Sequence, residues 1–318
     1  MKPLLAIAET IRREYQLIVL VSVIVGLGSG LLTTAPGDAL QTAANPIMFL
    51  MIFSISLSIT PRQFIMVIYQ PAAVLAGLVF NFLFMPLLCW ALARLFVTDS
   101  SFYTGILLIG VMPCAGMAAV FTALADGDVP LGLAINALTM VLGPFLIPLE
   151  MGLMIQSDLA LDSLALFKQL AILLLLPLGL GVGLRWLADR RIDTRPYLPL
   201  LPALSGVAAT FIRFAVCNRS IPSILERPAS ILQLTLLVTV IFTIAFLIPN
   251  WIGKHFFDEK ARIAITFSSG MKNLGIAVGL ALTSFPEAVG LPVMLGMIVQ
   301  ILTSSLFYRM ILGKSMKT

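Results

Sequence analysis

The chain has 318 residues, of which 59% are hydrophobic and only 11% are charged, and its mean hydropathy is +1.05. Soluble domains carry about a quarter charged residues, so this composition excludes an ordinary soluble protein and predicts a polytopic membrane protein. The 20 Lys and Arg against 15 Asp and Glu follow from the positive-inside rule in such a protein, so we expect a lipid bilayer, and no nucleic acid, as its partner.

Apolar runs that are divided by turn residues and charges predict about ten membrane spans. In chain order these runs cover residues 17–32, 45–59, 71–96, 103–125, 130–155, 163–188, 197–216, 228–252, 261–283 and 288–312. A helix needs about 20 residues to cross a bilayer. The expected fold class is therefore an all-α integral membrane protein.

Most basic residues would lie on the side of the membrane that carries both ends of the chain. An even number of spans puts the two termini on one side, and that side collects Lys2, Arg12, Arg13, Arg62, Arg185, Arg190, Arg191, Arg195, Lys254, Lys260, Arg262, Arg309, Lys314 and Lys317. On or near the other side lie Arg94, Lys168, Arg219 and Arg227. The positive-inside rule then predicts cytoplasmic termini and a location in the cell inner membrane.

Ten spans divide into two halves, residues 1–156 and 157–318, and an odd number of spans in each half requires the second half to be inverted. The fourth span of each half has a Gly-Met pair among small residues, within Pro113–Val120 and within Ser268–Leu274. Interrupted spans at corresponding positions of two halves mark the binding site of many secondary transporters. The sequence therefore predicts a binding site at these two segments.

The span at residues 261–283 carries a lysine at its centre. A lysine there costs roughly 2.5–3.5 kcal/mol on insertion scales, and about ten span residues on each side argue against a side chain that reaches the interface. Lys272 could receive an anionic substrate group, take the place of a coupling cation, or carry a proton. The candidate site at this break comprises Ser268, Ser269, Gly270, Met271, Lys272 and Asn273.

Other polar side chains within the spans are expected to cluster around Lys272. They are Asn81, Asn136, Thr139, Gln300 and Thr303. The alternative for each of them is an ordinary hydrogen bond between helices. The acidic residue closest to mid-span is Glu150, near the outer end of its span, so the sequence predicts no carboxylate-based proton relay.

Cys114 follows the helix-breaking Pro113. A small buried hydrophobic side chain is the simpler interpretation of this residue, and a thiolate ligand for a soft ion is the alternative. The three cysteines have neither metal-site nor disulfide spacing. Phosphate-binding loops, metal-ligand pairs and nucleophile motifs are also missing from the sequence, so we expect neither an enzyme nor a cofactor.

Together these segments resemble the bile acid:sodium symporter family over nearly the whole chain. The matching segments are residues 57–64, 81–86, 113–120, 124–131 and 266–275. The resemblance implies two inverted five-span repeats that form a panel domain and a core domain, with the fourth and ninth spans broken and crossing near the midplane. It also implies transport of bile acids or smaller organic anions, which sodium drives in many members.

The chain departs from this family at the positions of its two sodium sites. Sodium-coupled members have hydroxyl, amide and carboxylate side chains where this chain has Asn81, Ala118, Ala119, Gly132, Asn136, Ser268 and Lys272. A hard cation needs oxygen ligands and compensating negative charge. The comparison with the family therefore implies that sodium binding is lost, and that the ammonium of Lys272 lies where the second sodium would lie.

Arsenite-efflux permeases of the same superfamily provide the alternative interpretation. Cys114 and Met117 match their span-four pattern, but Asn273 stands where they have a glutamate. We therefore expect an alternating-access transporter of a small organic anion, independent of sodium and either coupled to protons or uncoupled. At the first break its site would include Cys114, Ala115 and Gly116, and arsenite efflux through Cys114 is the second hypothesis.

Overall fold

The computed structural model describes residues 14–59, 66–155, 163–191 and 200–315, together with residues 10, 193 and 197. Within this part, the regular elements are all helices. Five stretches are long and apolar enough to cross a membrane, Pro71–Phe96, Val129–Met154, Leu164–Ala188, Pro228–Phe256 and Glu287–Ile311. The bent pair of Leu17–Gly30 and Ala35–Thr42 would make a sixth. An all-helical membrane protein is thereby confirmed, whereas the count of ten spans stays a prediction.

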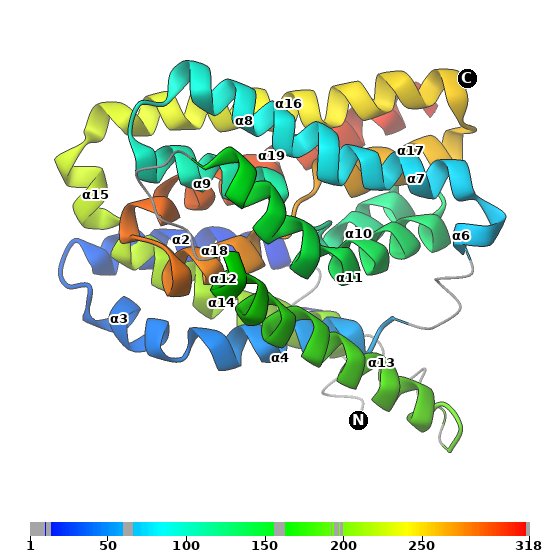
Figure 1. The fold of residues 1–318 in the computed structure, drawn as a ribbon, viewed down its shortest axis with the longest axis horizontal. Helices are drawn as coiled ribbons and strands as arrows, with labels where there is room; N and C mark the ends of the chain where they lie inside the picture. The colour runs from blue at the N-terminus through cyan, green and yellow to red at the C-terminus, as the bar shows by residue number, and fades with distance from the viewer. Residues whose placement is uncertain are drawn as a thin grey trace.

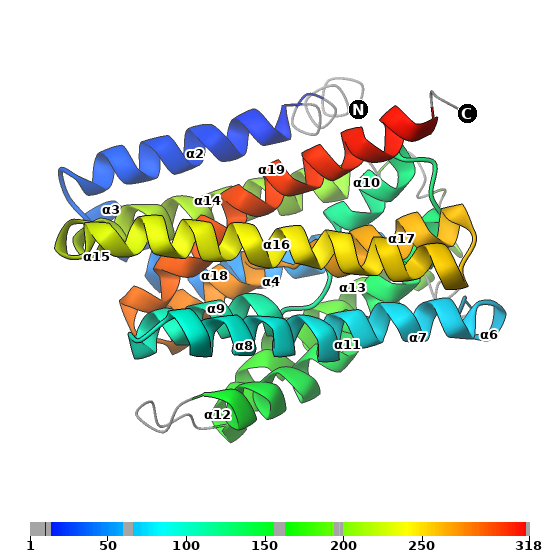
Figure 2. The same cartoon turned by 90° about the horizontal axis from the view of Figure 1, so that it is seen from above.

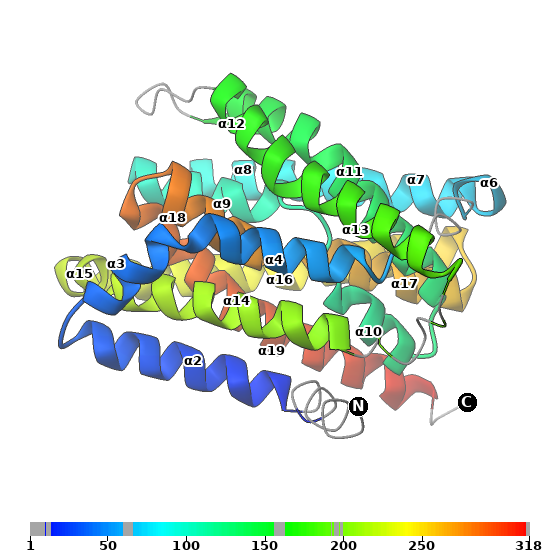
Figure 3. The same cartoon turned by 90° about the horizontal axis from the view of Figure 1, so that it is seen from below.

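Helix α14 (Leu200–Arg219) packs against α2, α3 and α4, and α13 packs against α4; we call these helices, together with α12 and η2 that lead into α13, the panel unit. Figure 3 shows α14 between α2 and α4. The close packing depends on small residues, because a Cβ on Gly30 would lie 2.4 Å from the backbone oxygen of Asn218. The unit comprises α2 (Tyr15–Gly30), α3 (Ala35–Thr42), α4 (Ala44–Ser56), α12 (Ser163–Leu170), the π-helical turn η2 (Ala171–Leu175), α13 (Leu176–Ala188) and α14.

The remaining long helices form the core unit, in which α16 lies against α17 and α19, and α8 lies against α9. In Figure 1, α16, α8, α7 and α17 of this unit occupy the upper half, above α3, α4 and α13. The unit comprises α7 (Pro71–Val79), the π-helical turn η1 (Phe80–Phe84), α8 (Met85–Phe96), α9 (Ser100–Val111), α10 (Met117–Leu124), α11 (Val129–Met154), α16 (Pro228–Phe256), α17 (Glu259–Gly270), α18 (Leu274–Ser284), η4 (Glu287–Val289) and α19 (Gly290–Ser315). Short helices α6 (Met66–Tyr69) and α15 (Ile221–Glu226) connect the others.

Both expected interruptions are present in the core unit. The first span ends as α9 at Val111, because Pro113 forces the preceding Met112 into an extended conformation with ψ of 147°. The second ends as α17 at Gly270, and Met271 is extended with φ of −106°. After each break the chain continues as a new helix, α10 or α18. The breaks therefore lie inside the core unit and not at its ends.

Some span boundaries differ from the predicted ones. The expected span at residues 17–32 is followed by α3, which turns back at 119°. The span expected at residues 197–216 is α14, which continues to Arg219. Residues 60–64 of the family-like segment 57–64 lie outside the described residues. Figure 2 shows that α3 and α15 lie at one end of the bundle, whereas the start of α2 and the end of α19 lie toward the other.

Candidate functional site

The two interrupted spans cross and pair through their backbones. The N–H of Ala115 donates to the oxygen of Met271 at 2.8 Å, and the N–H of Asn273 donates to the oxygen of Pro113 at 2.8 Å. Cys114 and Lys272 thus form an isolated antiparallel bridge. Backbone groups without partners are very costly at membrane depth, and this pairing satisfies groups that the helix breaks leave open.

One side chain from α19 completes the backbone bonding of Lys272. Gln300 accepts from the N–H of Lys272 at 2.8 Å and donates to its carbonyl oxygen at 3.0 Å. These two bonds act like a third strand beside the bridge. The crossing is therefore held from α19 by a single amide side chain.

The other half of the crossing is held from α11 in the same way. Asn136 donates to the carbonyl oxygen of Cys114 at 2.9 Å, and the N–H of Cys114 donates to the hydroxyl of Thr139 at 3.2 Å. Polar residues on α11 and α19 thus make equivalent hydrogen bonds at the two breaks, and the structure brings Asn136, Thr139 and Gln300 together at the crossing. Thr303 bonds only to its own helix.

The Lys272 side chain is fully buried and points away from the exposed part of the crossing. Its Nζ donates to the carbonyl oxygen of Asn81 at 2.9 Å, to the Asn81 side-chain oxygen at 3.1 Å and to the carbonyl oxygen of Met112 at 2.9 Å. An ammonium has three N–H donors, so all three are used. The carbonyl of Met112 ends α9, where the helix dipole favours a cation.

The backbone carbonyl of Asn81 has no helical N–H partner because of the π-helical turn η1. In this π-helical turn the N–H of Met85 donates to Phe80, one residue further back than in an α-helix. The next residue is Pro86, which has no N–H to donate to Asn81. The turn therefore leaves one carbonyl oxygen for Lys272, and the Asn81 amide donates to the oxygens of Gly77 and Ser268 at 2.8 and 3.1 Å.

The second break is closely packed around Lys272. Gly270 lies against Phe246, where a Cβ would come within 2.5 Å of the ring. Met271 is buried, and the hydroxyl of Ser269 donates to its own helix at 2.7 Å. The Ser268 hydroxyl is fully buried. Ser268, Ser269, Gly270 and Met271 therefore form the buried side of the crossing.

The positions that correspond to the family's sodium sites hold few oxygen ligands. Ala118 and Ala119 offer none in their side chains. A Cβ on Gly132 would lie 3.6 Å from the hydroxyl oxygen of Thr122 and 3.8 Å from that of Ser268. The side-chain donors are thus the hydroxyls of Thr122 and Ser268 and the amide oxygen of Asn136, without a carboxylate, which fits a sodium ion poorly.

The partly exposed face of the crossing is formed by Ala115, Gly116, Met117 and Asn273. The Cys114 thiol is fully buried and lies 3.4 Å from the oxygen of Ala115. Helix α4 of the panel unit covers this face, because a Cβ on Gly116 would come within 2.9 Å of Ile55 and one on Gly275 within 3.2 Å of the Met51 sulfur. The crossing therefore lies at the boundary between the two units.

Sequence reasoning missed the burial of Glu150. Only 8% of this residue is exposed, and within the part of the chain that the structure describes one of its carboxylate oxygens lacks a hydrogen-bond partner. The helical spacing from Asn136 through Gly143 and Ile147 to Glu150 would have predicted an inward-facing side chain. The absence of a carboxylate-based proton relay therefore stays a prediction, with Glu150 as the buried carboxylate on which it can be tested.

Comparisons with known proteins agree with this geometry. Residues 45–227 match the model of the family described as Sodium Bile acid symporter family. "Uncharacterized protein YbaS" of Bacillus subtilis (strain 168) is 26% identical over 242 residues, covering 75% of this chain and 78% of that protein. "Uncharacterized sodium-dependent transporter YocS" of the same organism is 23% identical over 244 residues, covering 76% and 74%. "Probable sodium/metabolite cotransporter BASS3, chloroplastic" of Oryza sativa subsp. japonica is 27% identical over 237 residues, covering 73% of this chain and 54% of that protein.

Proposed function

The chain belongs to the sodium bile acid symporter family and is a membrane transporter, and from this premise we propose that it moves a small organic anion by alternating access. The observation that carries the proposal is the crossing of the two interrupted spans. Helices α10 and α18 both start at the crossing. Their first N–H groups carry positive partial charge, which favours an anionic group. Ala115, Gly116, Met117 and Asn273 are the residues there that a substrate can reach.

Lys272, in this proposal, replaces a coupling cation and does not touch the substrate. Its ammonium has three oxygen ligands, is fully buried, and bonds only to residues of the core unit. A tethered ammonium supplies the positive charge that a bound sodium would otherwise bring. Since the remaining sodium-site positions provide no carboxylate, transport is proposed to be independent of sodium.

Coupling to protons is the remaining option for active transport, and Glu150 is the residue through which to test it. It is a buried carboxylate on α11, the helix whose Asn136 and Thr139 hold the first break. Replacing it with Gln removes the titrating group while keeping the shape of the side chain. If protons couple through Glu150, uptake by Glu150→Gln should no longer respond to a pH gradient, whereas exchange of substrate across the membrane should persist.

We propose that the protein lies in the cell inner membrane with both termini in the cytoplasm, and that residues 1–156 and 157–318 are inverted repeats. The basic residues on the terminal side support the orientation. The repeat is supported by the equivalent hydrogen bonds that side chains of α11 and α19 make to the backbone at the two breaks. In this orientation α3 and α15 lie at the outer face.

The function is tested by uptake into proteoliposomes. A thermal-shift screen of carboxylates and bile acids would first select an anion that stabilises the purified protein. Uptake of that anion should be the same with and without a sodium gradient, and a clear sodium stimulation would overturn the sodium-independent mechanism. Arsenite resistance that is lost in Cys114→Ser cells would instead support the second hypothesis, although the buried thiol does not favour it.

A further inference from the structure

Three side chains of the panel unit hold one short segment of the core unit at the end of the bundle where α3 and α15 lie. This segment, residues 282–287, runs from the end of α18 into η4. Gln41 of α3 donates to the oxygen of Leu282 at 2.6 Å. Gln169 of α12 donates to the hydroxyl of Thr283 at 2.9 Å and accepts from the hydroxyl of Ser284 at 2.7 Å.

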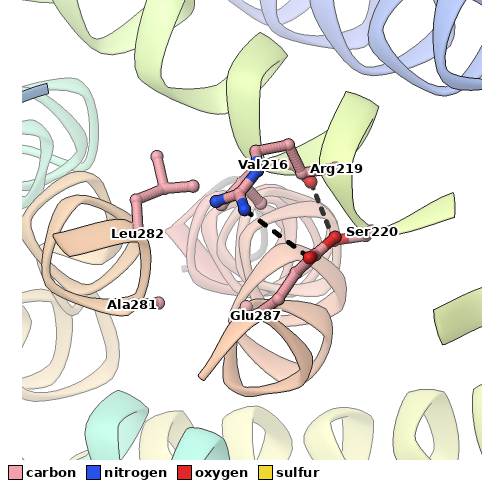
Figure 4. A pocket seen from close by; sticks show the side chains of 7 residues that line it. Val216, Arg219, Ser220, Ala281, Leu282 and Glu287 are labelled. Carbon is pink, nitrogen blue, oxygen red and sulfur yellow. Dashed lines mark hydrogen bonds and ion pairs between the residues drawn. The ribbon is translucent and has the colours of Figure 1, made fainter. Parts of the chain in front are cut away.

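The third side chain is Arg219, at the last residue of α14. Its Nε lies 2.8 Å from a carboxylate oxygen of Asp38, within the panel unit, and its Nη2 lies 3.5 Å from Glu287, in the core unit. Figure 4 shows Arg219 and Glu287 facing each other across a small cleft that Leu282 and Ser220 also line. One guanidinium thus bridges the two units, and Asp38 fixes its orientation.

Polar contacts at the opposite end of the bundle have a different pattern. There Gln70 bonds to Asp128 at 2.7 Å within the core unit, and Arg262 bonds to Glu259 at 3.0 Å within the same unit. Arg185 and Asp189 pair within the panel unit. The hydrogen bonds and the ion pair described above, which join the panel unit to the core unit, therefore lie at the end that carries Arg219.

We infer that Arg219, Gln41 and Gln169 form a gate that closes the boundary between the two units at this end and opens when the units separate there. The inference rests on the proposed alternating access, in which each end of the boundary must open in turn. The gate's carboxylates are half-exposed, and ion pairs at such positions contribute little. The contacts can therefore break in every cycle.

Helix α18 connects this gate directly to the crossing. It begins at Leu274, beside the bridge of Lys272 and Cys114, and ends at Ser284, which bonds to Gln169. The helix is buried from Leu274 to Leu282, and its continuous hydrogen bonding lets a displacement at one end reach the other. A substrate bound at the crossing can thus change the gate through the position of α18.

A cross-link across the gate tests this inference. The natural cysteines, Cys89, Cys114 and Cys217, are buried, so a bifunctional methanethiosulfonate reagent with a short spacer should link an introduced pair selectively. Cross-linking of Gln169→Cys/Thr283→Cys in proteoliposomes should lower uptake at least tenfold, and a thiol reductant should restore it. The control is Asp99→Cys/Arg227→Cys, an ion pair at the same end but within the core unit, for which the same reagent should leave uptake unchanged. Equal uptake before and after cross-linking of the first pair would overturn the gate.

A second measurement needs no substrate and so separates the gate from the proposed function. Ala281→Cys places a thiol in the cleft beside Arg219. A membrane-impermeant maleimide should label it several-fold faster when Glu287→Gln removes the charge that bridges the units. An unchanged labelling rate in a protein of unchanged thermal stability would overturn the gate, even if no transported anion had been found.

Discussion

The crossing and the gate are two polar clusters that differ in their burial and in the units that they join. At the crossing, Lys272 is fully buried and its ammonium bonds only to residues of the core unit. At the gate, Arg219 joins partly exposed carboxylates from two different units. A buried and fully bonded cluster resists change, whereas exposed ion pairs are weak and exchangeable. The comparison indicates that the crossing travels as a fixed part and that the gate is the part that rearranges.

The largest effect is expected for Lys272→Met, which would break the fixed cluster. The variant leaves the oxygens of Asn81 and Met112 without donors inside the protein. Unsatisfied buried acceptors cost about 1–3 kcal/mol each, so the free energy of unfolding should fall by about 3 kcal/mol or more. Thermal unfolding of the purified protein measures this loss. The control is Lys168→Met, at an exposed position on α12, which should change stability by less than about 0.5 kcal/mol.

Gln300→Leu should have the next largest effect. It removes both bonds to the backbone of Lys272 and leaves a buried N–H and a buried carbonyl unpaired, at about 2 kcal/mol or more in total. Thr303→Val, one turn further along the same helix, loses only bonds to its own helix and should cost below about 1 kcal/mol. Equal losses for the two variants would show that the amide does not hold the crossing.

The double variant Lys272→Gln/Ser268→Glu would turn the fixed cation site into an exchangeable one. It restores a carboxylate and removes the ammonium, which gives sodium the ligands it needs. Sodium at a hundred times its dissociation constant should then stabilise the variant by about 2.7 kcal/mol, as a rise in the melting temperature measures. The unmodified protein should not respond to sodium, and a similar rise in that protein would contradict the role given to Lys272.

The smallest effect on stability is expected for Glu287→Gln at the gate. The carboxylate of Glu287 is partly exposed and 3.5 Å from Arg219, so its loss should change the free energy of unfolding by about 1 kcal/mol or less. Melting temperatures in matched buffers measure this change. A loss as large as that of Lys272→Met would mean that the gate is part of the fixed structure, and the contrast between the two clusters would fail.

The sequence predicted the parts of the site whose causes are local. Pro113 and the small residues around Gly270 indicate the two breaks, and the central position of Lys272 marks it as functional. The ligands of Lys272 were not predictable in detail, because the free carbonyl of Asn81 depends on a π-helical turn. Its partners come from 160 and 191 residues away in the chain, and spacing alone carries no information at that range.

The bend between α2 and α3 was missed for the same reason. The side-chain oxygen of Asn218 accepts from the N–H of Gly37 at 3.0 Å, and its amide donates to the oxygen of Thr33 at 3.0 Å. One side chain from α14 thus stabilises the turn between two helices that lie more than 180 residues earlier in the chain. A local pattern of residues 17–42 predicts only that the apolar run ends.

The tethered ammonium has an electrical consequence for the proposed cycle. A sodium ion leaves with the substrate, whereas Lys272 stays in the core unit and returns with it after the substrate is released. A membrane voltage of 100 mV acts on one elementary charge with up to about 2.3 kcal/mol. If Glu150 returns as a neutral acid, the empty carrier is positive and an inside-negative voltage pulls it inward. If Glu150 returns ionised, the two charges cancel and the voltage exerts no net force on the empty carrier. The electrical current of the return step therefore reports whether Glu150 carries a proton.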